Sequence, residues 1–356
     1  MNVVRVAQVA PIARAVGPQT GSSIEDLVWL LTEELVQRGH DVTLFATGDS
    51  RTSARLQARY PVSYHQDSRL WNNWQFHELV HTAAAFERGS DFDVIHSHVY
   101  AFPAPFSRMV DTPVVHTDHI PTERDLVRCY ARYPETHLVA LSEYHRRKLQ
   151  PLSDVAVVPN GIDTDSFPFG PTAGDYLLFL GHLISRKAPV EAIRVARNAG
   201  IRLVLAGKGS DDYFTTEVKP LIDGRHVEHV GQVGVEERNA LLAGAGALVF
   251  TSVAREPFGL VLVEAMACGT PVIALDRCAV PEIVEPGVTG CYADDVDRLA
   301  ELVPAALAID RNRVREEARR RFDYRRMTDD YERLYERLAR SADSSIPAPA
   351  TTSSKS

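Results

Sequence analysis

Short apolar runs rich in β-branched residues alternate with amphipathic stretches along most of the sequence. The first run, VVRVAQVA, covers Val3 to Ala10, and the stretch from Ile24 to Arg38 then repeats its apolar residues at helical spacing. Runs of this kind, bounded by turn residues, are typical of parallel strands that are buried on both faces. Because strands alternate with helices, the sequence predicts an α/β fold with doubly wound sheets.

The alternation stops once and then restarts. The segment PNGIDTDSFPFGPTAGD, from Pro159 to Asp175, is rich in Pro, Gly and Asp and reads as a linker. Strand-like runs precede it (FDVIHSHVY, TPVVHTDH, THLVALSE) and follow it (YLLFLG, IRLVLAGKG, HVEHVGQV, GALVFTSV, TPVIALD). A chain of 356 residues is also long for one core. We therefore predict two consecutive Rossmann-like domains, residues 1–168 and 169–323.

The end of the chain divides into a helix and a tail. Residues 324–341 are highly charged but carry a stripe of apolar and aromatic residues at helical spacing, namely Tyr324, Met327, Tyr331, Leu334, Tyr335 and Leu338. This pattern predicts an amphipathic helix that docks on the body of the protein, returning to the first domain. Residues 342–356 have low complexity and are predicted to be disordered.

Composition excludes several classes of protein. The net charge of −8 argues against a nucleic-acid binder. The four cysteines show no CxxC spacing, which is expected of reduced thiols. No apolar run reaches about 18 residues and no signal segment opens the chain. We expect a cytoplasmic protein without a membrane span.

The stretch REPFGLVLVEAMACGTPV, from Arg255 to Val272, places two glutamates in an apolar run. A helix that begins near Gly259 after a strand would expose its first N–H groups where open α/β sheets bind ligands, and such a helix start favours phosphate. Glu264 would then need a partner, because an unpaired buried carboxylate costs several kcal/mol or is protonated. Ligand hydroxyls, such as those of a ribose, or a buried arginine would each satisfy it. Glu256, at the turn, could bind a sugar or acyl group.

Several segments resemble one known family, in its order: LLTEELVQRGHDVTLFATGDS, DVIHSH, VVPNGIDTDSF, LLFLGHLISRKAP, EPFGLVLVEAMACGTPVIA and VPEIVEPGVTG. The chain is similar to retaining GT-B glycosyltransferases of family 4, close to the branch that acts in actinobacterial antibiotic assembly. The resemblance implies two Rossmann-like domains facing each other across a cleft. It also implies transfer of a hexose from a UDP- or GDP-sugar to a hydroxyl of a small molecule or glycan. No metal or other cofactor is expected.

The resemblance assigns roles to individual residues. It implies that Glu264 binds the nucleotide ribose, that Glu256 contacts the transferred sugar, that Lys187 neutralises the diphosphate and that His119 faces the reacting sugar. The predicted catalytic residues are His119, Lys187 and Glu256. The predicted donor-binding residues are Gly21, Ser22, Gly181, His182, Arg186, Lys187, Gly207, Lys208, Val233, Glu256, Pro257, Phe258, Gly259, Leu260 and Glu264. Retention would follow from front-face attack, with the leaving phosphate helping to take the acceptor proton.

The sequence departs from the family pattern at two places. The family usually has arginine after the glycine of LGR, whereas His182 follows Gly181 here, and a neutral histidine is a weaker clamp for a diphosphate. Arg186 could compensate. The first loop usually carries a Gly-Gly pair, but here Ser22 and Ser23 follow the glycine, and their side chains restrict close backbone approach. Both departures point to a weakened or specialised site.

Four alternatives remain open from the residues alone. His96, His98, His116 and His119 end neighbouring strands and could form a zinc site in a hydrolase, although His116 fits a core position better. The segment AGKGS lacks the spacing of a dinucleotide loop, which disfavours an NAD enzyme. A non-catalytic nucleotide-sugar-binding protein and a GT-B sugar-nucleotide epimerase are the remaining alternatives. The triplets DFD and DTD are expected to be solvated or capping residues.

Substrate selection is expected to depend on loops. The base would be read near residues 207–210 and 231–234, and the acceptor near residues 60–74 and 120–133. Trp71 and Trp74 could stack on a sugar ring, although packing within the domain is the simpler expectation.

Overall fold

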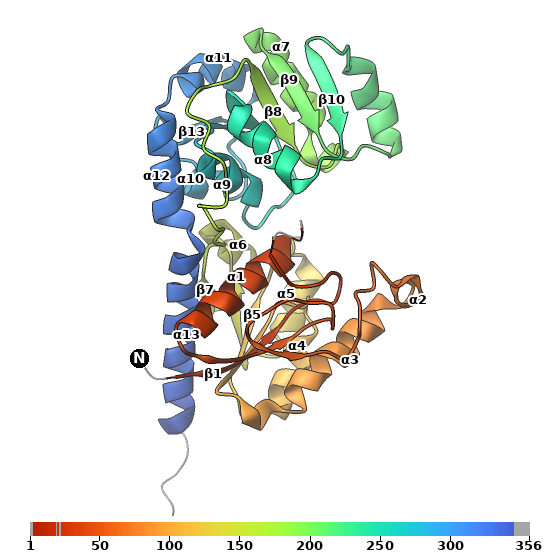
Figure 1. The fold of residues 1–356 in the computed structure, drawn as a ribbon, viewed down its shortest axis with the longest axis vertical. Helices are drawn as coiled ribbons and strands as arrows, with labels where there is room; N and C mark the ends of the chain where they lie inside the picture. The colour runs from red at the N-terminus through yellow and green to blue at the C-terminus, as the bar shows by residue number, and fades with distance from the viewer. Residues whose placement is uncertain (1–2, 19, 21–22, 345–356) are drawn as a thin grey trace, which may run out of the picture.

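Two separate parallel sheets form the centres of two domains, one above the other in Figure 1. The computed structural model describes residues 3–18, 20 and 23–344. Every strand pair within the described residues is parallel, and helices connect most of the successive strands. The predicted α/β class with two Rossmann-like domains is therefore confirmed.

The first domain has a seven-stranded sheet in the order β3-β2-β1-β4-β5-β6-β7. Its strands are β1 (Arg5–Val9), β2 (Asp41–Phe45), β3 (Arg55–Gln57), β4 (Val94–Ser97), β5 (Val114–Thr117), β6 (Thr136–Ala140) and β7 (Val155–Val157). Its helices are α1 (Ser23–Gln37), α2 (Ser68–Trp71), α3 (Trp74–Phe86), α4 (Pro103–Phe106), α5 (Arg124–Tyr130) and α6 (Glu143–Lys148). The strand order reverses between β1 and β4, so a ligand crevice is expected at their carboxyl ends.

The second domain has a six-stranded sheet in the order β10-β9-β8-β11-β12-β13. Its strands are β8 (Tyr176–Leu180), β9 (Arg202–Ala206), β10 (Val227–Gly231), β11 (Ala247–Phe250), β12 (Val272–Leu275) and β13 (Gly290–Ala293). Its helices are α7 (Pro189–Ala199), α8 (Val235–Gly244), α9 (Leu260–Ala267), α10 (Val280–Ile283), α11 (Val296–Leu307) and α12 (Arg311–Phe322). Here the order reverses between β8 and β11, which places the quoted segment 255–272 at the second crevice.

The last helix, α13 (Tyr324–Ser344), leaves the second domain and lies along the first (Figure 1). Its buried side chains Met327, Tyr331, Leu334, Tyr335 and Leu338 pack in one apolar cluster with residues of β1, α1 and β2. The predicted return of this helix to the first domain is confirmed. The helix includes residues 342–344, which were predicted to be disordered, whereas residues 345–356 lie outside the described part of the chain.

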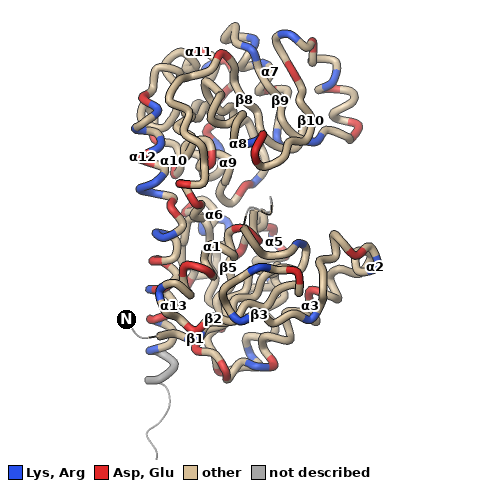
Figure 2. Tube along the Cα trace, viewed as in Figure 1, with Lys and Arg blue, Asp and Glu red and all other residues tan. Residues whose placement is uncertain are grey.

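Acidic and basic residues are interspersed along α12 and α13 (Figure 2). Arg320 pairs with Glu317 at 2.6 Å, and Arg333 and Arg326 both pair with Asp330. Exposed pairs of this kind contribute about 0–1 kcal/mol each, so the docking of α13 depends mainly on its buried apolar stripe. Within the described residues, no helix is both long enough and apolar enough to span a membrane.

Candidate active site

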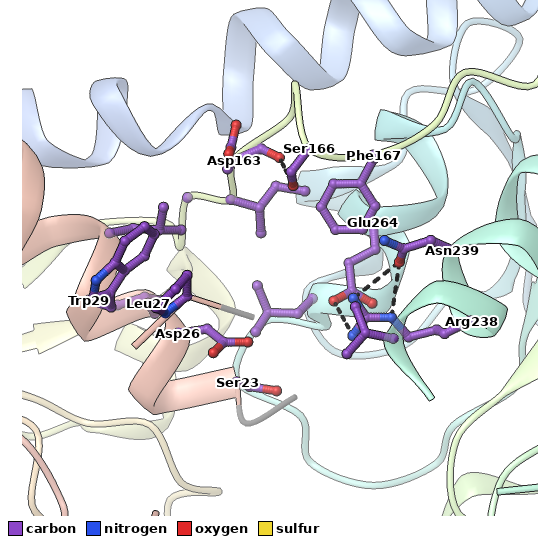
Figure 3. Close-up of a pocket in the computed structure, with 16 residues that line it drawn as sticks. Ser23, Asp26, Leu27, Trp29, Asp163, Ser166, Phe167, Arg238, Asn239 and Glu264 are labelled. Atoms are coloured by element: carbon purple, nitrogen blue, oxygen red, sulfur yellow. Dashed lines mark hydrogen bonds and ion pairs between the residues drawn. The ribbon is translucent and has the colours of Figure 1, made fainter. Parts of the chain in front are cut away.

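Two neighbouring cavities lie between the domains. The larger has a volume of about 1010 Å³ and the smaller, drawn in Figure 3, about 880 Å³. Both are lined by Ser23 from α1 and by Arg238, Leu260 and Glu264 from the second domain. Because four residues belong to both walls, the two cavities are parts of one interdomain cleft.

Helix α9 meets this cleft with one face. It begins after Gly259, whose φ of +106° lies in the left-handed region that favours glycine. The buried side of the helix carries Leu262, Val263, Ala265, Met266 and Ala267. Leu260, Val261 and Glu264 line the larger cavity instead. An otherwise apolar helix can therefore carry a glutamate, because Glu264 lies on the face that opens onto the cleft.

Glu264 has a protein partner in this structure. Its Oε1 lies 3.4 Å from Nη1 of Arg238 on α8, and its side chain is 17% exposed. Burial raises the pKa of Glu264, Arg238 opposes that shift, and Asp26 adds to it. Figure 3 shows Asp26, on α1 of the first domain, on the opposite side of the cavity. Of the two partners that the sequence left open, an arginine is thus the one present.

Glu256 and Lys187 form an ion pair with each other. The Oγ of Ser252 donates a second hydrogen bond to Oε1 of Glu256, at 2.7 Å. The backbone carbonyl of Arg186 accepts N–H bonds from Val253 at 3.0 Å and Ala254 at 2.9 Å. These contacts hold the loop before Glu256 against the short 3-10 helix Ser185–Lys187. Glu256, predicted to bind the sugar, and Lys187, predicted to bind the diphosphate, therefore lie side by side at the cavity wall.

His119 lines the larger cavity from the first domain. Its Nε2 lies 2.9 Å from Nδ1 of His98, and burial lowers the pKa of His119 to about 3. A neutral imidazole at this position can bind a hydroxyl but does not carry a positive charge at neutral pH.

The four histidines do not form a metal centre. His116 is fully buried and its ring nitrogens contact Tyr130 and the carbonyl of Ser97, which confirms the predicted core position. No group of three or more His, Cys, Asp or Glu residues that could hold a metal ion occurs within residues 3–18, 20 and 23–344. The zinc-hydrolase alternative therefore has no structural support.

Most of the predicted donor-binding residues share the larger cavity. Its walls contain Gly181, His182, Lys187, Glu256, Pro257, Phe258, Gly259, Leu260 and Glu264. Gly21 and Ser22 lie outside the described residues.

Four other predicted residues line neither of these two cavities. The side chains of Arg186 and Lys208 are exposed, and Val233 packs against the core that contains α9. Gly207 has a structural reason to be glycine, because a Cβ there would lie 1.9 Å from the carbonyl oxygen of Gly181. Their assignment to donor binding stays a prediction.

Sequence reasoning missed three polar residues that line the cleft or contact a residue lining it. Arg238 lies in the charged segment VEERN, which reads as a solvated helix face, and no spacing relates it to Glu264. Ser252 follows β11 and contacts Glu256 only after the loop folds back. Asp26 carried a usable signal, since it lies in the first turn of a helix that starts at the predicted crevice.

Comparison with known families covers most of the chain. The model "Glycosyltransferase Family 4" matches residues 24–166, and the model "Glycosyl transferases group 1" matches residues 163–322. Fold and site together define a glycosyltransferase with two Rossmann-like domains. The chain belongs to the GT-B glycosyltransferases of family 4, as its motifs indicated.

Several named proteins are similar to this chain in sequence or in structure. Phosphatidyl-myo-inositol mannosyltransferase of Mycobacterium leprae is 28% identical, over 89% of this chain and 94% of the relative. Glycogen synthase of Mycobacterium tuberculosis is 27% identical, over 78% and 80% respectively. Among solved structures, AviGT4, a glycosyltransferase involved in avilamycin A biosynthesis, has a TM-score of 0.72 at 25% identity and covers 95% of this chain and 98% of its own. HepE of Anabaena in complex with UDP has a TM-score of 0.69 at 17% identity, with 94% and 100% covered, and shows the shared fold alone.

Proposed function

We propose that this chain is a retaining hexosyltransferase that uses a UDP- or GDP-sugar and glycosylates a hydroxyl group. One observation carries the proposal: His119, Lys187, Glu256 and Glu264 line a single cavity between the two domains. Each has chemistry that fits a different part of a nucleotide sugar. No metal is needed, because a lysine and a helix start meet at the expected place of the diphosphate.

The proposed roles follow from charge and position. Lys187 and the free N–H groups at the start of α9 would stabilise the negative charge that develops on the leaving diphosphate. Glu264 would accept hydrogen bonds from the ribose hydroxyls and Glu256 from the sugar. Both carboxylates must exchange a protein partner for the ligand, namely Arg238 and Lys187.

The proposed reaction proceeds on one face of the sugar. The bond between the anomeric carbon and the diphosphate oxygen breaks, and the acceptor oxygen bonds to the same face. The acceptor proton passes to the leaving phosphate oxygen. The two departures from the family pattern lie close to this point, since His182 lines the cavity and Ser23 belongs to both cavity walls.

The proposed acceptor is a small molecule or glycan that binds against the first domain. Aromatic rings contact one another there. The ring centroids of Trp71 and Tyr64 are 5.6 Å apart, and those of Trp74 and Tyr100 are 4.9 Å apart. Trp71 is 48% exposed, so its ring can stack on a sugar. A role in natural-product or cell-surface glycan synthesis is proposed by analogy with the named relatives.

A donor screen tests the proposal. The purified chain is heated with UDP, GDP and their sugars, and a true donor raises the melting temperature by mass action. Product NMR with the active donor should show a retained anomeric configuration, and inversion would contradict the proposed mechanism. Binding without transfer to any acceptor would favour the accessory-protein alternative. A changed sugar on the nucleotide without an acceptor would favour the epimerase.

A further inference from the structure

A chain of hydrogen bonds runs from the cleft into the first domain. His119 Nε2 lies 2.9 Å from His98 Nδ1, His98 Nε2 lies 3.1 Å from Gln8 Oε1, and Gln8 Nε2 lies 3.1 Å from the hydroxyl of Tyr335. Gln8, His98 and Tyr335 are each at most 2% exposed. We call these four residues the His119–Tyr335 relay. It joins the carboxyl ends of β1 and β4 to helix α13.

The direction of each hydrogen bond follows from the amide of Gln8. An amide oxygen only accepts and an amide nitrogen only donates, so Nε2 of His98 must carry the proton that reaches Gln8. Burial, followed by the neighbouring histidines, lowers the pKa of His98 well below its usual value, so its ring is neutral and Nδ1 accepts. His119 must then donate from Nε2, which leaves Nδ1 without a proton. Nδ1 of His119 has no hydrogen-bond partner within the described residues.

The hydroxyl of Tyr335 continues the chain of hydrogen bonds beyond the amide of Gln8, from which it accepts. Because it accepts from Gln8, its own proton is available to Nδ1 of His96, which lies 2.5 Å away. His96 then donates from Nε2 to Thr117 at 2.8 Å, and Thr117 donates to Tyr331 at 2.8 Å. Turning the amide over would reverse every one of these donors, so the branch beyond Tyr335 and the relay have one common polarity.

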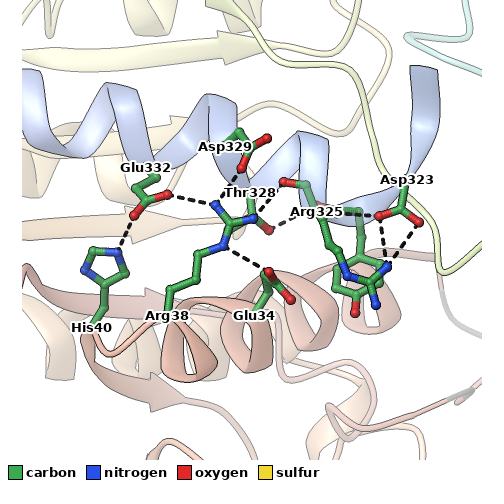
Figure 4. Close-up of polar contacts among 9 residues, drawn as sticks. Glu34, Arg38, His40, Asp323, Arg325, Thr328, Asp329 and Glu332 are labelled. Carbon is green, nitrogen blue, oxygen red and sulfur yellow. Dashed lines mark hydrogen bonds and ion pairs between the residues drawn. The ribbon is translucent and has the colours of Figure 1, made fainter. Parts of the chain in front are cut away.

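The helix α13, which carries Tyr335, is held by polar contacts to the C-terminal end of α1 and the residues after it (Figure 4). Arg38 donates to Glu34 at 2.9 Å, to Asp329 at 2.6 Å and to Glu332 at 2.8 Å, and Glu332 also lies 2.9 Å from His40. Burial alone would lower the pKa of Arg38, but the three carboxylates raise it. The helix that carries Tyr335 is therefore fixed on the first domain by charge as well as by its apolar stripe.

We propose that Gln8, His98 and Tyr335 are positioning residues that hold His119 in the Nε2–H tautomer. His119 thereby presents an unprotonated Nδ1 to the cleft, which accepts a hydrogen bond from a hydroxyl group of the ligand. Only the identity of that ligand as the transferred sugar rests on the proposed function. The consequence is selective: a group that can donate a hydrogen bond is accepted at this point of the cavity, and a group that can only accept is not.

Two matched variants test the relay. Tyr335→Phe removes the hydroxyl that accepts from Gln8, whereas Tyr331→Phe removes the same atom from the same helix at the far end of the other branch. The readout is nitrogen-15 NMR of the histidine rings, with the His119 signals identified by their loss in His119→Gln. Wild type and Tyr331→Phe should show Nδ1 of His119 unprotonated, and Tyr335→Phe should show a mixture of both tautomers. Gln8→Met should behave like Tyr335→Phe, and it replaces that variant if Tyr335→Phe does not fold.

Measuring kcat distinguishes a positioning role of Tyr335 from an effect of the substitution on protein stability alone. Tyr335→Phe should lower kcat roughly three- to tenfold, the value of one hydrogen bond, while Tyr331→Phe should lower the melting temperature similarly and leave kcat unchanged. Affinity for UDP or GDP alone should not change in either variant, because neither ligand contains the transferred sugar. A proton on Nδ1 of His119 in wild type, or unchanged tautomers in both Tyr335→Phe and Gln8→Met, would overturn the proposal. If wild type binds neither nucleotide, the proposed function fails while the tautomer result still stands.

Discussion

The two walls of the cleft are built in opposite ways. On the first domain, His119 is neutral and belongs to a buried chain of hydrogen bonds that is already formed without a ligand. On the second domain, Glu256 and Glu264 are paired with cations of the protein. One wall is therefore arranged in advance, whereas the other must exchange partners when a ligand binds.

Because the charged pairs are partly exposed to solvent, breaking them costs little free energy. The side chains of Lys187 and Glu256 are 28% and 17% exposed, and those of Arg238 and Glu264 are 25% and 17% exposed. Ion pairs that reach solvent contribute about 0–1 kcal/mol, so a diphosphate or a pair of ribose hydroxyls can replace the protein partner. The pairs then keep the carboxylates and the lysine in place until a ligand arrives.

The charged wall should show the largest effect. Glu256→Gln and Lys187→Met are each expected to lower kcat by about 10²- to 10³-fold, because each removes a group aimed at charge that develops during transfer. Glu301→Gln, in an exposed pair on α11, is the matched control and should leave kcat unchanged. Steady-state kinetics with the donor identified by the screen measures this, and near-normal turnover in Glu256→Gln would place the chemistry elsewhere.

The second effect separates binding from chemistry on the same wall. Glu264→Gln should weaken binding of the nucleotide about 10- to 100-fold, since a hydrogen bond to a charged group is worth about 1.5–3 kcal/mol. Calorimetric titration with UDP or GDP alone is the measurement, because neither contains the sugar that Glu256 is proposed to bind. Equal affinities of wild type and variant would refute the ribose assignment.

Substitutions that disturb the first-domain side should lower the stability of the protein rather than its affinity for the ligand. Arg38→Met leaves two nearly buried carboxylates, Glu34 and Glu332, without their guanidinium partner and should reduce the free energy of unfolding by about 2–4 kcal/mol. Denaturant unfolding measures the loss, with Arg298→Met on α11 as the control. An unchanged stability would show that α13 docks through its apolar side alone.

The smallest expected effect is a shift in pH dependence. Glu264 must be ionised to accept two hydroxyls, so nucleotide affinity should fall as the pH falls through its raised pKa. Arg238 lowers that pKa while Asp26 raises it, and Arg238→Met should therefore move the decline in affinity to higher pH. Titrations across the acidic range compare wild type, Arg238→Met and Arg202→Met, the last being a surface control. A decline that moves to lower pH would contradict the sign of this coupling.

The difference between the walls also explains what the sequence could predict. The alternation of strands and helices indicated both domains, and the turn at Gly259 together with the apolar run indicated α9. These are local patterns, because each depends on residues a few positions apart.

The partners of the site depend instead on tertiary folding. Gln8 and Tyr335 are 327 positions apart, and Arg38 and Glu332 are 294 apart. No local spacing predicts such contacts, nor that Glu264 takes Arg238 from a helix that reads as solvated. Helix α13 continues to Ser344, three residues past the predicted boundary, because composition alone does not determine where a helix ends.

The central claim is that the cleft binds a nucleotide sugar through Glu264. The most direct test is a thermal-shift titration of wild type and Glu264→Gln with UDP- and GDP-sugars. We predict that at least one of them raises the melting temperature of wild type in proportion to the logarithm of its concentration, and that the same concentrations shift Glu264→Gln much less. The account would be contradicted if none of these donors stabilised wild type, or if both proteins were stabilised equally.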